Sequence, residues 1–157
     1  MFVSPTKVIL PRKTKNDLVV YLNLGVYRNL HYQVNNQAKS KYNNLMFEQL
    51  HNIKFSGMIT MKFRYIKGSH RISDKSNVLS IVEKFFCDSL TTYGCLEDDN
   101  DNFILSQEYL PTKYDKNNAR VEIEIEDGFM ADLVPDKQSE LFNKKEEVTI
   151  YDREEET

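Results

Sequence analysis

The arrangement of apolar and polar positions predicts five strands in this chain. Segments that are rich in β-branched and aromatic residues, or that alternate between apolar and polar residues, lie at 8–10, 18–24, 58–65, 103–108 and 119–126. In the segment 58–65, the alternation places Lys62 and Arg64 on the solvated face of a half-buried strand.

Apolar residues at spacings of three and four predict two longer helices. The first begins at Asn35 as its cap and runs to about His51. The segment 23–35 before it follows neither the strand nor the helix period, so we expect a loop that presents its side chains.

The second helix runs from Asn77 to about Tyr93, with Ser73 or Asp74 as its cap and Gly94 as its left-handed stop. On a helical projection, three polar residues fall within roughly 20° of one another beside the apolar side. These residues are Asn77, Lys84 and Asp88. We expect this polar stripe to be held against the body of the domain.

Length and composition favour one globular domain. The chain has 157 residues, of which 40% are apolar and 29% charged. Together with the order of the elements, this predicts an α+β domain with one mixed sheet and two main helices. No apolar run of membrane-spanning length and no signal-peptide pattern occurs, so we expect a cytoplasmic protein. Cys87 and Cys95 are too few for a disulfide framework and are expected to be buried thiols.

The charges are strongly segregated along the chain. Residues 1–75 hold 13 Lys and Arg against 3 Asp and Glu, whereas residues 76–126 hold 4 against 11 and residues 127–157 hold 4 against 10. A basic half suggests a polyanionic partner, and clustered carboxylates suggest a cation site or a self-covering tail. Two oppositely charged faces of an ordinary domain remain the alternative. We predict a domain at 1–126 followed by an acidic tail at 127–157.

The chemistry-bearing residues gather around the second helix. Asp74 precedes this helix, and four carboxylates follow it at Glu97, Asp98, Asp99 and Asp101. Magnesium is held by a few carboxylates from separate elements, so these residues are candidate ligands. A solvated acidic loop and a simple helix cap are the alternatives. No P-loop, dinucleotide-binding glycine pattern or nucleophile elbow occurs.

Several of these segments resemble, in their order, the RusA family of phage and prophage Holliday junction resolvases. The matching segments are RISDKSN at 71–77, KFFCDSL at 84–90, Gly94, EDDN at 97–100, Pro111 and RVEIEI at 120–125. The resemblance covers roughly residues 17–126. It implies a small homodimeric α+β endonuclease that cuts branched DNA with magnesium.

The resemblance also implies roles for individual residues. Asp74 and Asp99 would bind the metal with Asp98, and Lys84 would lie near the phosphate. Asn77 would support the metal ligands. Asp88 would either support these ligands or have a purely structural role. Ser76 stands where the family usually has a second Asp, which removes one carboxylate, and four extra residues separate Asn77 from Lys84. Four residues are about one helical turn, so Lys84 stays on the stripe.

These observations predict a magnesium-dependent endonuclease that acts on Holliday junctions in phage recombination or replication. Asp74, Asp98 and Asp99 are expected to converge on one ion. The basic residues expected to bind DNA on the same side are Arg28, Lys39, Lys62, Arg64 and Arg71. The alternatives are a catalytically inactive relative that only binds DNA, and an interaction protein whose acidic tail acts on a host factor.

Overall fold

In the part of the chain that the structure describes, the main sheet has five strands. The computed structural model of this chain describes residues 1–129. The strands are β1 (Phe2–Ser4), β4 (Met58–Lys67), β5 (Ile104–Tyr109), β6 (Lys113–Tyr114) and β7 (Arg120–Phe129). Their order is β1-β7-β4-β5, with β6 also pairing with β4. β7 is antiparallel to β1 and β4, whereas β4 is parallel to β5 and β6, so the sheet is mixed.

A two-stranded hairpin stands apart from the main sheet. It consists of β2 (Lys7–Leu10) and β3 (Leu18–Tyr21), which pair antiparallel with Val8 opposite Val20. These two strands were predicted from the sequence, although β3 ends three residues earlier than expected. Val8 and Val20 face inward and are buried, so the hairpin extends the core beside the helices.

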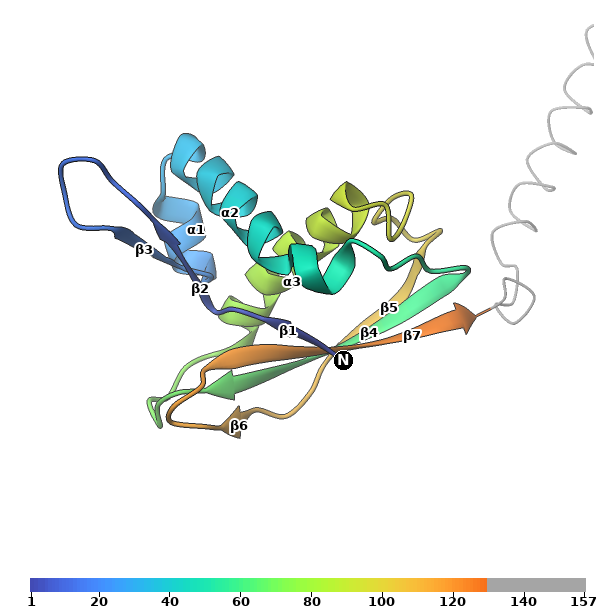
Figure 1. The fold of residues 1–157 in the computed structure, drawn as a ribbon. Helices are drawn as coiled ribbons and strands as arrows, with labels where there is room; N and C mark the ends of the chain where they lie inside the picture. The colour runs from blue at the N-terminus through green and yellow to red at the C-terminus, as the bar shows by residue number, and fades with distance from the viewer. Residues whose placement is uncertain (130–157) are drawn as a thin grey trace, which may run out of the picture.

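Three helices complete this α+β fold within the described residues. They are α1 (Leu24–Asn29), α2 (Tyr32–Leu50) and α3 (Lys75–Thr92). Figure 1 shows α2 and α3 on one face of the sheet, with α1 beside the hairpin. α2 and α3 are the two predicted main helices, and each lies within a few residues of its predicted bounds.

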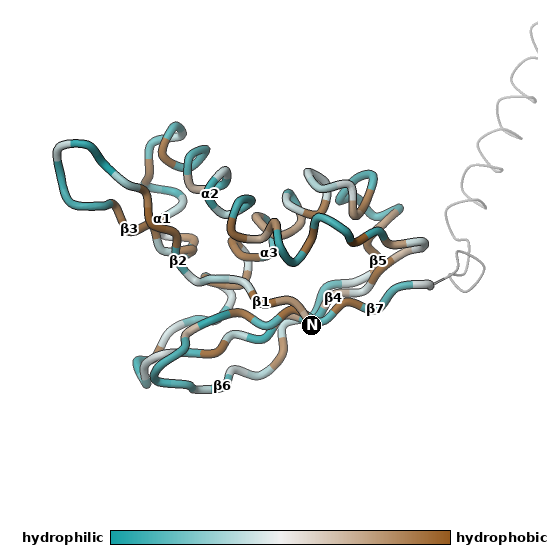
Figure 2. The backbone as a smooth tube through the Cα atoms, viewed as in Figure 1, coloured by the Kyte–Doolittle hydropathy of each residue, from teal (hydrophilic) through white to brown (hydrophobic). Residues whose placement is uncertain are grey.

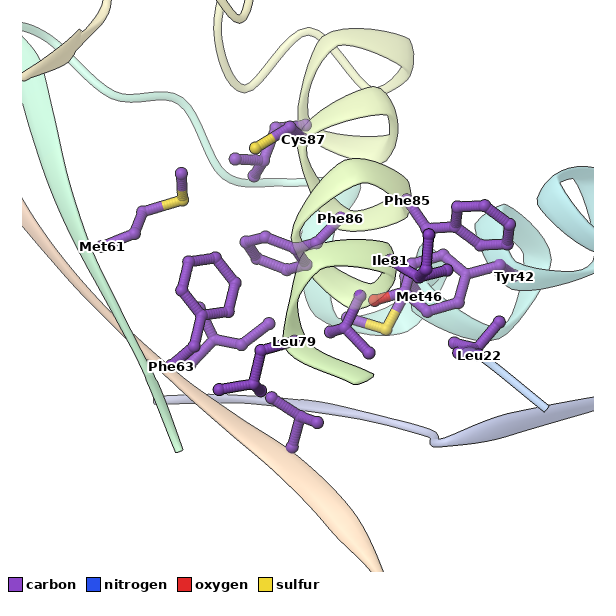
Figure 3. Close-up of a cluster of buried hydrophobic side chains, with 14 of the residues drawn as sticks. Leu22, Tyr42, Met46, Met61, Phe63, Leu79, Ile81, Phe85, Phe86 and Cys87 are labelled. Carbon is purple, nitrogen blue, oxygen red and sulfur yellow. The ribbon is translucent and has the colours of Figure 1, made fainter. Parts of the chain in front are cut away.

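The core lies between α2, α3 and the sheet. Figure 2 shows the hydrophobic parts of the helices turned toward hydrophobic parts of the strands. Phe86 of α3 is fully buried, with its ring centroid 5.8 Å from that of Phe2 and 6.5 Å from that of Phe63. Phe85 faces α2 and meets Tyr42 edge-on, as Figure 3 shows. α3 therefore joins the sheet to the other helices.

The segment 23–35 is not the loop that its sequence suggested. Asn23 caps α1 by accepting a hydrogen bond from the Gly25 amide at 2.9 Å. Tyr27 packs edge-on against Phe85, with ring centroids 6.2 Å apart. α2 is capped by His31 rather than by Asn35, which lies one turn inside the helix. Tertiary packing of Tyr27 against α3 thus orders a segment that has no periodic pattern.

The far face of the sheet is polar and carries balanced charges. Along β4, Ile59, Met61 and Phe63 are buried against the helices, so Lys62 and Arg64 point the other way. β7 places Glu124 opposite Lys62 and Glu122 opposite Arg64. Opposite charges across neighbouring strands stabilise the pair. This face is therefore not a basic surface.

The connection from β4 to β5 fixes where the ends of α3 lie. Because β4 and β5 are parallel, the chain must cross back over the sheet between them, and α3 makes this crossover. The start of α3 thus lies near the end of β4, and the loop after α3 lies near the start of β5. Figure 1 shows these two places at opposite ends of the molecule.

Candidate active site around helix α3

Asp74 is the N-terminal cap of α3 and is one of the two residues, with Ser73, that the sequence predicted for this position. Its Oδ1 accepts hydrogen bonds from the Ser76 amide at 2.9 Å and from the Ser76 hydroxyl at 2.7 Å. Both bonds hold the pKa of Asp74 below its ordinary value, and the bond from the hydroxyl has the larger effect. The carboxylate is exposed and ionised at neutral pH.

The acidic loop after α3 is organised by its own side chains. Asp98 accepts hydrogen bonds from the Asp99 amide at 2.8 Å and from the Asn100 side chain at 2.7 Å. All residues from Glu97 to Asn102 are exposed. Both carboxylates of the Asp98–Asp99 pair can therefore be reached from solvent.

Asp99 lies near the C-terminal half of α3. Burial, together with the negative charges of Glu83, Asp99 and Asp88, raises the pKa of the Cys87 thiol to about 12. Cys87 and Cys95 are both buried and unbridged, as expected. Cys87 is thus a neutral core group and not a nucleophile.

The predicted convergence of Asp74 with Asp98 and Asp99 is wrong for a single chain. α3 has 18 residues and is therefore ~27 Å long, and the two groups lie beyond its opposite ends. Within residues 1–129, no three His, Cys, Asp or Glu side chains are close enough to share a metal ion. The parallel pairing of β4 with β5 imposes this separation.

The predicted polar stripe of α3 is held against the body of the domain at Asn77 and Asp88, but the prediction is wrong for Lys84, which is exposed. Asp88 forms an ion pair with Lys39 of α2 at 3.2 Å, which ties the two helices together. Asn77 is half-buried, and Lys84 is exposed. One turn from both Ser76 and Lys84, the buried hydroxyl oxygen of Ser80 has no hydrogen-bond partner in the part of the chain that the structure describes.

The five basic residues proposed for DNA binding do not share one face. Lys62 and Arg64 are on the far face of the sheet, where Lys62 pairs with Glu126 at 3.7 Å and Arg64 donates to the Pro111 carbonyl at 2.8 Å. Lys39 is on the helical side, in the ion pair with Asp88. Arg28 and Arg71 are exposed, on α1 and before α3 respectively. Contact with DNA by any of the five stays a prediction.

A basic surface that the sequence analysis missed surrounds the start of α3. It comprises residues 67–75 and 110–120, here called the α3-start surface. These two segments hold six Lys and Arg but only two Asp. They are brought together because β6 pairs with the end of β4. Pairing between segments so far apart in the sequence leaves no local signal.

Two pockets flank the helical layer. One of about 770 Å³ lies beside the hairpin and is lined by three lysines and one carboxylate, namely Lys7, Lys41, Lys116 and Asp17. It adjoins the α3-start surface, because Lys116 belongs to both. The other, of about 930 Å³, lies beside Gly94 and Cys95 and includes neither Asp98 nor Asp99.

A titration tests the local geometry at the start of α3. Replacing Ser76 by Ala removes the hydroxyl donor but keeps the amide, so we expect the pKa of Asp74 to rise part of the way toward 3.8. Because the folded-state pKa is lowered, the associated stabilisation is present above the unfolded-state value and is lost as the pH falls through the folded-state value. An NMR pH titration of the Asp74 carboxyl resonance measures the change.

Ser80→Ala is the matched control for this titration, because Ser80 is on the same helix and does not contact Asp74. An unchanged Asp74 pKa in Ser76→Ala would show that the hydroxyl does not donate to this carboxylate.

No protein-family model matches this chain, and no curated protein is significantly similar to it in sequence. Among residues 1–129, no helix combines the length and the hydrophobicity needed to cross a membrane.

Proposed function

We propose that this protein is a magnesium-dependent endonuclease of branched DNA that works as a homodimer. The observation that carries the proposal is the placement of the resolvase-like residues. Asp74 and Ser76 at the start of α3, Lys84 on it, and the Asp98–Asp99 pair after it are all accessible to solvent. The βαβ connection also gives these residues the order of elements that the resemblance implies.

Two protomers are needed because one chain separates its own carboxylates. In a two-fold symmetric dimer, each contact occurs twice with the roles of the protomers exchanged. A two-fold axis across the middle of α3 would bring the start of this helix in one protomer toward the acidic loop of the other. Asp74 would then face Asp98 and Asp99 of the partner subunit. The side of α3 that would form this contact carries the exposed residues Ser76 and Lys84.

The candidate ligands are of the chemical type that magnesium prefers. Asp74, Asp98 and Asp99 offer the hard carboxylate oxygens that Mg²⁺ prefers, although Asp74 is partly occupied by its bonds from Ser76. A bound magnesium ion would activate water and offset negative charge during phosphodiester hydrolysis. Lys84 would bind the phosphate as a point charge, and Asn77 would orient neighbouring groups. Asp88 holds α3 to α2 through Lys39.

A second candidate is a catalytically inactive relative of these resolvases that binds branched DNA without cutting it. The contact between Ser76 and Asp74 favours this candidate. A hydroxyl that donates at 2.7 Å supplies no negative charge and competes with a metal for the same carboxylate oxygen. An interaction protein acting through its acidic tail stays a third alternative, and residues 130–157 of that tail lie outside the described residues.

Cleavage of a synthetic four-way junction tests the proposal. The protein is incubated with end-labelled junction or with linear duplex, with magnesium or with EDTA. The endonuclease predicts magnesium-dependent nicks near the branch point and none in the duplex. Junction binding without nicks under all conditions would favour the second candidate.

Ser76→Asp distinguishes a weakened enzyme from an inactive one. An Asp at this position cannot donate to Asp74 at neutral pH and adds a hard ligand at a helix start, where a negative charge is favourable. We expect half-maximal nicking at roughly tenfold lower magnesium than in the wild type, because the site regains a charged ligand. Ser76→Asn is the control, since it offers an oxygen without a charge. Lower activity at every magnesium concentration would mean that the existing carboxylates already suffice.

A further inference from the structure

Among residues 1–129, the most exposed of the large apolar side chains lies within the α3-start surface. Ile72 has a relative exposure of 104%, whereas the other large exposed apolar residues among residues 1–129 have 75% or less. It lies two residues before Asp74, in the segment that leads from β4 into α3. A single exposed apolar side chain is ordinary by itself, so the case for a role depends on the groups that surround Ile72.

An aromatic pair lies on the same surface. His70 stacks on Tyr114 with ring centroids 3.6 Å apart and an interplanar angle of 27°. Both residues are exposed, so this pair is not part of the core. Two stacked rings offer a flat surface of the kind on which unpaired bases stack.

Hydrogen bonds hold the segment before α3 against the rest of this surface. Lys67 Nζ donates to the Ser73 carbonyl at 3.2 Å, and Lys75 Nζ donates to the Leu110 carbonyl at 3.2 Å. The Asp115 amide donates to the Lys67 carbonyl at 2.8 Å. Ile72 is therefore presented by a segment that is tied down on both sides.

The surroundings of Ile72 are basic rather than apolar. Arg71 is exposed beside it, and Lys113 and Lys116 are exposed on the facing segment. Arg120 is the exception, because Asp115 and Glu122 neutralise it. Beyond Lys116 lies the pocket lined by Lys7 and Lys41. Arg71, Lys113 and Lys116 form no ion pair within the part of the chain that the structure describes. A single apolar side chain among such cations suits a polyanion that also offers apolar faces.

We propose that Ile72 is a wedge that enters between bases at the branch point of the DNA, where the pair of His70 and Tyr114 receives an unstacked base. This inference rests on the proposed function, and it names the feature of the substrate that is recognised. Proteins that kink DNA insert single apolar side chains between base steps while cations hold the phosphates. A branch point costs less to open than continuous duplex, because its stacking is already interrupted.

The charge of the surroundings favours DNA over a protein partner. A protein interface would need an apolar patch, and the nearest neighbours of Ile72 in the sequence are Arg71 and Ser73. In DNA, the side chain of Ile72 would contact the faces of the bases, and the cations around it would bind the phosphates on either side.

The test uses junctions that carry 2-aminopurine beside the branch point, at the base that the wedge leaves behind and not at the base that the aromatic pair receives. The fluorescence of this base rises when it loses its stacking partner. The wild type should raise the fluorescence. Ile72→Ser should remove most of the rise and lower the preference for junction over duplex on the order of tenfold. Tyr114→Ala should act in the same direction, and Ile72→Leu and Tyr114→Phe should retain the wild-type signal. Because Ile72 is fully exposed, Ile72→Ser leaves the fold intact, which circular dichroism verifies.

Val19→Ser is the matched control, because it makes a similar change at an exposed β-branched residue of the hairpin. It should leave the fluorescence and the preference unchanged. Unchanged fluorescence and preference in Ile72→Ser would overturn the wedge. A change of sedimentation coefficient in Ile72→Ser, without a change of fluorescence, would assign this tip to contact between protein molecules and also overturn it.

The readouts separate the wedge from the nuclease. A fluorescence rise that depends on Ile72, in a protein that never nicks DNA, would support the wedge and contradict the endonuclease. Magnesium-dependent nicking with no dependence on Ile72 would do the reverse. Failure of the wild type to bind the junction would contradict both.

Discussion

Replacing Asp74 or Asp99 by Asn is expected to lower junction nicking on the order of 10³-fold. Loss of one carboxylate ligand removes several kcal/mol of stabilisation of the transition state, and about 1.4 kcal/mol corresponds to each factor of ten in rate. Both side chains are exposed, so neither change should disturb the core. Single-turnover nicking of a labelled junction in saturating protein measures the loss.

Binding provides the internal control for these two variants. The affinity for the junction in EDTA should stay within a few-fold of the wild type, because an exposed carboxylate repels phosphate rather than binding it. Glu48→Gln makes a comparable change on the exposed side of α2 and should leave nicking unchanged. Full activity of Asp74→Asn or of Asp99→Asn would remove that residue from the site.

Phe86→Ala is expected to lower the free energy of unfolding by about 3–5 kcal/mol. Phe86 has no exposed surface and fills the space between α3, Phe2 of β1 and Phe63 of β4. Its loss leaves a cavity at the centre of the contact between helix and sheet, which the rigid sheet cannot close. Urea denaturation followed by circular dichroism measures the change.

Phe47→Ala is the matched control, because Phe47 is 44% exposed and stacks on His51 at the surface of α2. It should cost less than about 1 kcal/mol. Similar losses in the two variants would mean that the packing of Phe86 does not dominate the core.

Elements with a strong period were predictable from the sequence, and elements set by long-range pairing were not. The alternation of β4 and the apolar spacing of α3 are local signals, and both elements lie where they were expected. β1 has three residues and exists because it pairs with β7, more than a hundred residues later. β6 has two residues and depends in the same way on β4. α1 depends on Tyr27, whose contact with Phe85 no local pattern reveals.

The candidate site shows the same division. The cap formed by Asp74 is a local feature, and the sequence predicted a cap at Ser73 or Asp74. The distance from Asp74 to the Asp98–Asp99 pair depends on the direction of β5 relative to β4, and residue spacing does not encode this direction. The proximity of His70 to Tyr114 is likewise a consequence of the pairing of β6 with β4.

The central claim is that each cleavage site combines residues from two protomers. It is tested most directly with a heterodimer of one Asp74→Asn protomer and one Asp99→Asn protomer, each with a different affinity tag. In a shared arrangement, one of the two sites of this heterodimer contains both substitutions and the other contains none. In an arrangement confined to single chains, both sites carry one substitution.

The measurement is magnesium-dependent nicking of a four-way junction by the purified heterodimer, compared with the two mutant homodimers and the wild type. We predict that the heterodimer nicks the junction at about half the wild-type rate, one strand at a time, while both homodimers are inactive. A heterodimer as inactive as the two homodimers, beside an active wild type, would contradict the shared site.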